Sequence, residues 1–426
     1  MDIILAPWGD PKGWKIVTYK YNNKFSSSFS SSLALADILD IPNENVIAIV
    51  SSTLIDRKVN DYNELVTNVR DNIHNTINDK YCNTKYDLNK IKPKIWVMPG
   101  IGSFRNGRFI HKGSTDLYYN SIYYNTLEYL KEVNEDVNLH IDLTHGINYM
   151  PVLAQDAIKL AASTFASMSG RHIKLFIYNS DPLYPFPGTD DPNIILDINN
   201  ISTINYHGYK SLQPLLLDYV INYDHNIYNW KRIASSNSVD DILIYKGAKA
   251  ASMGLLLVMG SIRDSLEMYK KHIEDTLSNL KDIKLECVEN GNIIFRYNTM
   301  LRREASILHA IACALLSIDI SSEVSITKLK DLVKLYYENV TEPVYNITIN
   351  EIDSIKSYKD MIKEEYELYG KIKYGIKFDS NKSCKPNKRN LYAHAGFEEN
   401  TIYLKKDRDE IYLSYENCLD EILKNI

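Results

Sequence analysis

An arginine, an amide and a histidine lie within two helical turns near the C-terminus, in the stretch KRNLYAHAG at Lys388–Gly396. Arg389 could hold a phosphate, because its planar guanidinium donates two parallel hydrogen bonds. His394 could move a proton, because an imidazole titrates near neutral pH. With the polar Asn390 beside them, they form a candidate catalytic set for cleavage of RNA through its 2′-hydroxyl, which needs a base, an acid and a cation at the phosphate.

The Arg-x4-His spacing is weak evidence by itself, because it recurs by chance on solvated loops. Positions five apart on a straight helix also diverge by roughly 140°. Two copies of the motif facing each other across a two-fold axis would form a better site than one copy. The preceding segment could attract an RNA backbone through six lysines: Lys371, Lys373, Lys377, Lys382, Lys385 and Lys388.

A second motif, DLTHGIN at Asp142–Asn148, follows an apolar segment and precedes a helical pattern. Backbone N–H groups at the start of a helix favour anions. Thr144 and Asn148 add donors suited to a phosphate, a ribose or a base edge, and His145 is interpreted as orienting a ligand. In the alternative interpretation, Thr144 caps the helix and Asp142 ties the loop.

Helices and strands must position these motifs. In the first 200 or so residues, short apolar segments alternate with amphipathic ones. Strands are expected at 3–6, 46–50, 95–98, 139–143 and 173–178, and helices at 30–39, 63–79, 118–133 and 150–167. This alternation predicts a mostly parallel, Rossmann-like α/β sheet.

Ligands bind such sheets at the carboxyl ends of the strands. We therefore expect the loops after the strands to form a pocket. In the alternative interpretations, Trp8 packs in the core and the hydroxyls at 51–53 cap a turn. The candidate ligand-binding residues are Trp8, Gly9, Asp10, Ser51, Ser52, Thr53, Gly100, Gly102, Ser103, Thr144, His145, Gly146 and Asn148.

The pattern becomes mostly helical after about residue 205. We expect an α/β domain at 1–205, a linker at 206–225 and a helical domain at 226–426, with helices at 241–280, 301–316, 326–337, 353–368 and 409–423. Asn290-Gly291 between two β-prone runs predicts a hairpin inserted near 284–297. The segment at 319–340 has no motif that assigns it a role, and His309 is interpreted as a core histidine.

Bulk properties restrict the function. A net charge of −5 over 426 residues requires any nucleic acid to meet a local basic site. The five cysteines are far apart, so neither a metal site nor a disulfide framework is expected. The absence of a signal peptide or a long apolar run predicts a cytoplasmic protein without a membrane segment. The chain also lacks the glycine fingerprint of a Rossmann oxidoreductase.

Three motifs together give a resemblance to a known family. Trp8-Gly9-Asp10, the D-x-T-H-G motif at Asp142–Gly146 and R-N-x3-H at Arg389–His394 resemble the DxTHG proteins of CRISPR systems, which pair an N-terminal CARF domain with a C-terminal HEPN domain. The resemblance covers both halves of the chain in the expected order. Arg389 and His394 match the catalytic pair, and Asn390 matches the polar residue after the arginine.

The resemblance implies an ancillary ribonuclease of type III CRISPR defence. Its activator would be cyclic oligoadenylate, most simply cyclic tetra-adenylate, whose two-fold symmetry fits a homodimer axis. Its substrate would be single-stranded RNA, cut without a metal or cofactor by a homodimer that could assemble further. The link to the effector complex would be functional rather than a stable contact. The alternatives are a non-catalytic nucleotide sensor and a ring nuclease that degrades its ligand in the N-terminal pocket.

Overall fold

The computed structural model describes residues 1–81, 92–104, 108–183, 188–225, 241–278, 283–287, 293–297 and 301–426. It divides into two compact units. The N-terminal unit comprises Met1–Ala162, Arg171–Tyr206 and Asp275–Ser306, and the C-terminal unit comprises Ser163–Gly170, His207–Glu274 and Ile307–Ile426. The chain therefore passes between the units several times.

The N-terminal unit is built on an eight-stranded sheet with the order β3-β2-β10-β9-β8-β1-β4-β5. Five neighbouring strands run parallel and coincide with the expected ones: β9 (His172–Ser180), β8 (Val137–Asp142), β1 (Asp2–Trp8), β4 (Val46–Ser51) and β5 (Lys94–Met98). Ile4 pairs with Val46 on one side and with His140 on the other. This confirms the expected α/β fold class. The sequence did not predict β2 (Val17–Tyr21), β3 (Lys24–Ser28) and β10 (Ile195–His207), which extend the sheet beyond β9.

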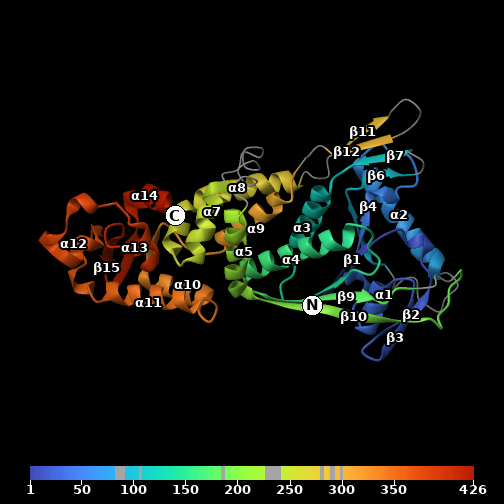
Figure 1. The fold of residues 1–426 in the computed structure, drawn as a ribbon, viewed down its shortest axis with the longest axis horizontal. Helices are drawn as coiled ribbons and strands as arrows, with labels where there is room; N and C mark the ends of the chain where they lie inside the picture. The colour runs from blue at the N-terminus through green and yellow to red at the C-terminus, as the bar shows by residue number, and fades with distance from the viewer. Residues whose placement is uncertain are drawn as a thin grey trace. The chain divides into compact units, whose positions relative to one another are not determined.

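Four helices connect these strands at the expected places: α1 (Ser31–Ile38), α2 (Tyr62–Tyr81), α3 (Thr115–Lys131) and α4 (Met150–Ser169). Helices α3 and α4 lie on one face of the sheet and α2 on the other (Figure 1). Helix α2 shows why periodicity locates such elements, because its buried Leu65, Val69, Ile73 and Ile77 recur every four residues.

The hairpin expected at 284–297 forms, but it belongs to the N-terminal unit. Strands β11 (Ile283–Cys287) and β12 (Ile293–Tyr297) pair antiparallel, while their turn lies outside the described residues. Strand β12 also pairs in parallel with β7 (Phe109–Lys112), which pairs with β6 (Ile101–Phe104), so the four strands form one small sheet (Figure 1). The prediction of an insertion in the helical domain was wrong because these pairings join segments 180 residues apart.

The C-terminal unit is mainly helical. Residues 206–225, expected as a linker, instead finish β10 and form α5 (Leu212–His225), whose apolar residues Leu212, Leu216 and Tyr219 are buried. The helix expected at 241–280 is two helices, α7 (Asp241–Ser252) and α8 (Leu256–Ser278). Gly254 separates them with a φ of +84°, and a Cβ there would lie 2.7 Å from the side chain of Val344. Both the left-handed φ and the close approach favour glycine.

The remaining helices are α9 (Glu304–Leu316), α10 (Ile326–Tyr337), α11 (Glu342–Lys356), α12 (Tyr369–Tyr374), α13 (Lys388–Ala393) and α14 (Leu419–Asn425). The predicted helices at 353–368 and 409–423 were wrong in most of their length. Those segments contribute to a small antiparallel sheet, β13-β16-β15-β14, formed by Glu323–Ser325, Glu410–Ser414, Tyr403–Asp407 and Glu367–Leu368. Ile411 and Leu413 are buried in β16, and their spacing of two is that of a strand.

A disulfide joins Cys384 to Cys418 in the C-terminal unit. The expectation of no disulfide was wrong, because the two cysteines are 34 positions apart in the sequence and match no spacing motif, and only the fold brings them together. Within the described ranges, no helix has the length and apolar character needed to span a membrane.

Candidate functional site

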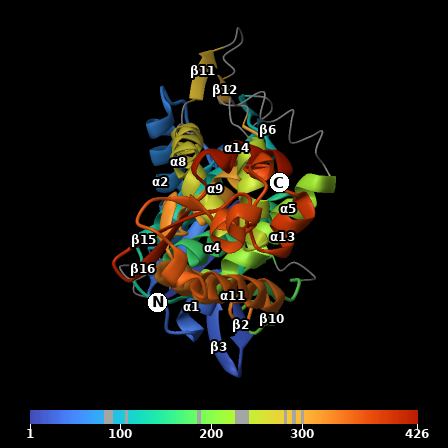
Figure 2. The ribbon, with the colours of Figure 1, turned by 90° about the vertical axis from the view of Figure 1, so that its left-hand side faces the viewer.

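The Arg-x4-His motif begins on α13, a six-residue helix that sits beside α11 in both views (Figures 1 and 2). The side chain of Asn387 caps α13 by accepting hydrogen bonds from the backbone N–H groups of Arg389 and Asn390. His394 is the first residue beyond the helix, with a φ of −112°. The straight-helix divergence between positions five apart therefore does not apply to His394, because the backbone leaves the helix before it.

Glu351 on α11 holds the ring of His394. Its Oε1 lies 2.8 Å from Nδ1 of the histidine. A carboxylate accepts this hydrogen bond, so it favours the ring form that carries its proton on Nδ1. The Nε2 of that form has a free lone pair. The His394 side chain is 47% exposed and that of Glu351 is 21% exposed, so the ring is open to a substrate while its orienting partner is mostly covered.

Arg389 and Asn390 are both exposed on α13. A hydrogen bond connects the side chain of Asn390 to Glu398, which is 5% exposed. Burial raises the pKa of Glu398, while hydrogen bonds from the Asn387 N–H and from Asn390 act in the opposite direction. Asn390 therefore helps fix the start of α13, and Arg389 presents its guanidinium to solvent.

Five of the six lysines at 371–388 are exposed: Lys371, Lys377, Lys382, Lys385 and Lys388. The sixth, Lys373, pairs with Glu399 at 3.0 Å. The segment leading to Arg389 is thus a mostly uncompensated positive surface, as an RNA-binding segment requires.

The loops expected to bind a ligand in the N-terminal unit meet at one edge of the sheet, because they follow the neighbouring parallel strands β8, β1, β4 and β5. The chain order reverses between β1 and β8, and such a switch point is where doubly wound sheets bind ligands. The loops after these two strands touch there, since the N–H of Gly9 donates to the carbonyl of His145 at 2.9 Å.

Asp142 is an anchor of this edge. It is 1% exposed, and its Oδ2 accepts from the Ser31 hydroxyl at 2.5 Å. Its Oδ1 accepts from the N–H and the hydroxyl of Thr144, at 3.1 and 2.6 Å. The Thr144 oxygen in turn accepts from the N–H of Ser180. Asp142 and Thr144 therefore tie three segments together, and Thr144 has little capacity left for a ligand.

His145 is held as a neutral ring. Burial lowers its pKa to about 3. The ring stacks on Trp14 with centroids 4.0 Å apart, and its Nε2 accepts from the backbone N–H of Ser31 at 3.2 Å. The Tyr19 hydroxyl lies 3.3 Å from the same nitrogen. This geometry gives His145 a role in shaping the loop.

The predicted ligand residues separate into buried and exposed groups. Trp8 is fully buried and its indole N–H donates to Ser32, so it does not stack on a ligand. The Ser52 hydroxyl is shared among the N–H of Gly100, the ring of His111 and the hydroxyl of Tyr297. Gly9 and Ser51 are also buried, and Thr53 is half-buried. The exposed candidates are Asp10, Gly102, Ser103 and Asn148.

A cavity of about 510 Å³ lies elsewhere in the N-terminal unit, between β3 and α1. Its lining carries three carboxylates, from Asp37, Asp40 and Glu44, against one lysine, Lys92, and none of the predicted ligand residues. An acidic lining does not suit a phosphate ligand, so the strand-end loops remain the candidate site.

Known protein families match both the N-terminal and the C-terminal part of the chain. Residues 3–182 match the CARF domain of the CRISPR system endoribonuclease Csx1, and residues 341–417 match its HEPN domain. The chain belongs to the Csx1 family. A curated relative, the CRISPR system endoribonuclease Csx1 of Methanocaldococcus jannaschii, is 27% identical over 437 residues, covering 97% of this chain and 87% of the relative.

The family assignment fits the geometry. The CARF match contains all the strand-end loops, and a CARF domain implies a nucleotide ligand. The HEPN match contains Glu351, Arg389 and His394, and a HEPN domain implies an RNA substrate and endoribonuclease activity. Sequence reasoning missed Glu351, because nothing in the pattern links it to a histidine 43 positions away.

Proposed function

We propose that this Csx1-family endoribonuclease cleaves single-stranded RNA by metal-independent acid–base chemistry at Arg389 and His394. We also propose that cyclic oligoadenylate, bound at the CARF domain, controls the cleavage. The observation that carries the first part is the 2.8 Å contact of Glu351 with Nδ1 of an exposed His394. It leaves Nε2 outside that contact on a ring that is half exposed, and the exposed Arg389 lies five positions earlier in the same short segment.

The reaction requires three contributions from catalytic residues: a base, a cation at the phosphate and an acid. Nε2 of one His394 takes the proton of the RNA 2′-hydroxyl, and the hydroxyl oxygen attacks the adjacent phosphate. Arg389 stabilises the charge that develops on the phosphate oxygens. Protonation of the leaving 5′-oxygen completes the cleavage and yields a 2′,3′-cyclic phosphate. A second copy of the motif, supplied by a homodimer, would provide the acid and a second guanidinium.

The control site is supported by the switch point between β1 and β8 and by the exposed polar residues around it. The hydrogen bonds of Asp142, Thr144 and His145 hold the loop in place, and Asn148 is exposed beyond them. A ligand shifts an equilibrium only through its different affinities for two states. A cyclic nucleotide seated on these loops must therefore bind one arrangement of the dimer more tightly.

The test is cleavage of labelled single-stranded RNA in EDTA, with and without cyclic tetra-adenylate, by the wild type and by His394→Ala. We expect ligand-dependent cleavage in EDTA, and a loss of about 10²- to 10⁴-fold in the variant. Ligand affinity should remain unchanged in the variant. Cleavage that survives the substitution would overturn the catalytic assignment.

Asn148→Gly tests the second part of the proposal, that a ligand bound at the CARF domain controls cleavage. Asn148 has a φ of +53°, and glycine adopts this conformation without strain. The variant should raise the ligand concentration needed for activation and leave the fully activated rate near that of the wild type. A binding-only sensor would show ligand affinity without cleavage. A ring nuclease would consume the ligand even when His394 is replaced.

A further inference from the structure

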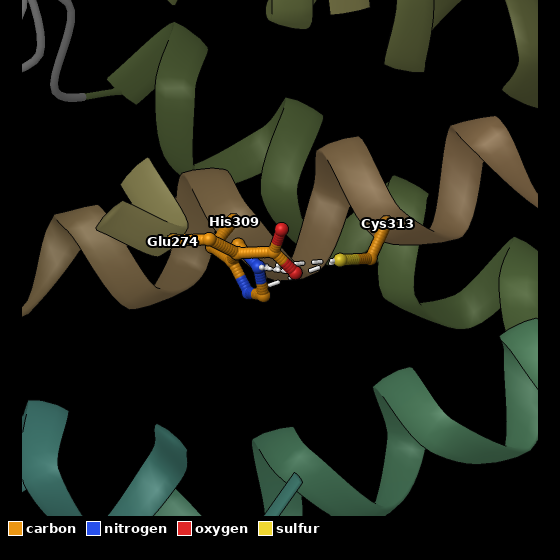
Figure 3. Close-up of side chains that lie close together, drawn as sticks. All are labelled: Glu274, His309 and Cys313. Atoms are coloured by element: carbon orange, nitrogen blue, oxygen red, sulfur yellow. Dashed lines mark hydrogen bonds and ion pairs between the residues drawn. The ribbon is translucent and has the colours of Figure 1, made fainter. Parts of the chain in front are cut away.

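A carboxylate, an imidazole and a thiol converge in the C-terminal unit, in a place that the RNA chemistry does not use. Glu274 lies near the end of α8, while His309 and Cys313 lie on α9 (Figure 3). The two α9 residues are four positions apart and so project from the same face of the helix. His309 is fully buried, Cys313 is 1% exposed, and the Glu274 side chain is 25% exposed.

Two of the distances in this trio are close to those of a metal coordination shell. Nε2 of His309 lies 3.2 Å from Oε1 of Glu274 and 3.5 Å from Sγ of Cys313, and all the candidate ligand atoms lie within 4.8 Å of one another. Zinc bonds of about 2.0–2.3 Å at tetrahedral angles place neighbouring ligand atoms about 3.3–3.7 Å apart. One ion could therefore reach all three side chains with small rotations.

The types of ligand atom indicate which metal ion the site would bind. A thiolate and an imidazole favour zinc and similar transition metals over magnesium or calcium, which take oxygen ligands. A glutamate is ordinarily ionised at neutral pH, and the hydrogen bond from His309 lowers the pKa of Glu274 further. Lys270 also pairs with Oε1 of Glu274, at 2.9 Å. This oxygen would exchange the hydrogen bond of His309 for the metal, while Lys270 could stay on the carboxylate as an outer partner.

We propose that Glu274, His309 and Cys313 form a zinc-binding site that fastens α8 to α9, with water as the fourth ligand on the partly exposed side of Glu274. Two anionic ligands and one neutral ligand balance the charge of Zn²⁺. The ion replaces a buried polar triad with bonds to all three residues. The site joins two helices and shares no residue with the pair Arg389 and His394, so the proposal is independent of the function proposed above.

Cobalt titration tests this site directly, because Co²⁺ takes zinc sites and a thiolate–cobalt bond absorbs light. The full-length protein is stripped with EDTA, reduced with a phosphine, exchanged into chelator-free buffer and titrated with Co²⁺. We expect a thiolate–cobalt band that saturates at one equivalent per chain and disappears when Zn²⁺ is added. Adding Zn²⁺ to the stripped protein should also raise its thermal midpoint by several degrees. A folded wild-type protein that gives no band would overturn the proposal.

Single substitutions test which residues give rise to the thiolate–cobalt absorption band. Cys313→Ser should abolish it, whereas Cys287→Ser removes a different thiol and should leave it unchanged. Glu274→Gln keeps the shape of a partly exposed side chain but loses its charge, so it should fold and bind Co²⁺ at least about tenfold more weakly. A band that persists in Cys313→Ser, or a Glu274→Gln variant that binds as tightly as the wild type, would contradict the assignment.

A further comparison separates this site from the catalytic one. Brief EDTA treatment of the zinc-loaded protein should lower its thermal midpoint and leave the cleavage rate per folded molecule unchanged. If EDTA instead abolishes cleavage without changing the thermal midpoint, the metal serves the chemistry and the structural role assigned here is wrong.

Discussion

Replacing Glu351 with glutamine should slow RNA cleavage while leaving the fold and RNA binding intact. The substitution keeps the size of the side chain but removes the charge that faces Nδ1 of His394 at 2.8 Å. A hydrogen bond to a charged group contributes about 1.5–3 kcal/mol, which corresponds to about 10- to 150-fold in rate. We expect the lower part of that range, because the His394 side chain is 47% exposed and solvent screens the carboxylate.

The assay is steady-state cleavage at saturating activator, with kcat and KM measured separately. In the proposed mechanism Glu351 orients the ring of His394 and does not touch the substrate, so kcat should fall and KM should change by less than about threefold. Asp353→Asn is the matched control. It removes the same charge from the same helix at a residue whose partner is Lys330, and it should leave kcat within about twofold of the wild type. A Glu351→Gln enzyme as fast as this control would refute the reasoning. Equal losses in both variants would point to the charge of α11 as a whole.

Three further predictions concern other parts of the chain. Arg389→Lys keeps the charge but loses the two-pronged donor, so single-turnover cleavage should fall at least about tenfold; an unchanged rate would reduce Arg389 to a point charge. Because the pKa of His145 is about 3 in the folded protein and 6.5 ordinarily, the unfolded chain binds a proton first as the pH falls. Stability should therefore decline below pH 6.5, by about 2 kcal/mol at pH 5, and denaturant unfolding of His145→Asn should show less of this decline. Reducing the bond between Cys384 and Cys418 should destabilise the oxidised protein by up to about 4 kcal/mol, the loop entropy for its 34-residue separation; identical denaturant midpoints with and without reductant would contradict this.

Much of the N-terminal fold could be predicted because its signals are local. The buried runs that form β1, β4, β5, β8 and β9 stand between helices whose apolar residues recur at helical spacing. The other strands escaped prediction because pairing, rather than local pattern, defines them. In Glu410–Ser414 buried and partly exposed residues alternate, as in a strand. The charged residues around this segment suggested a helix, and only its pairing with β13 and β15 defines it as a strand.

The candidate sites show the same limit. Arg389 and His394 lie close in the sequence and could be recognised as a motif. Glu351 acts through space, and so does Glu274 on His309, so neither could be found from spacing. Trp8 and Ser52 were predicted to face a ligand because they end strands, but their polar atoms are used in buried hydrogen bonds. The position of a residue at the end of a strand locates the loop and not the direction of its side chain.

The return of residues 275–306 to the N-terminal unit has a consequence for how the chain is made. The hydroxyl of Tyr297 bonds Ser52, a residue 245 positions earlier. At about 5–20 residues per second, a ribosome adds Tyr297 about 12–50 seconds after Ser52. The β6–β7 ribbon is complete once Lys112 has been added, and from then until β12 is made the edge that β12 will cover is open to other chains. A fragment ending near residue 206 would keep that edge open permanently, so a single cut in the chain cannot release the complete N-terminal unit.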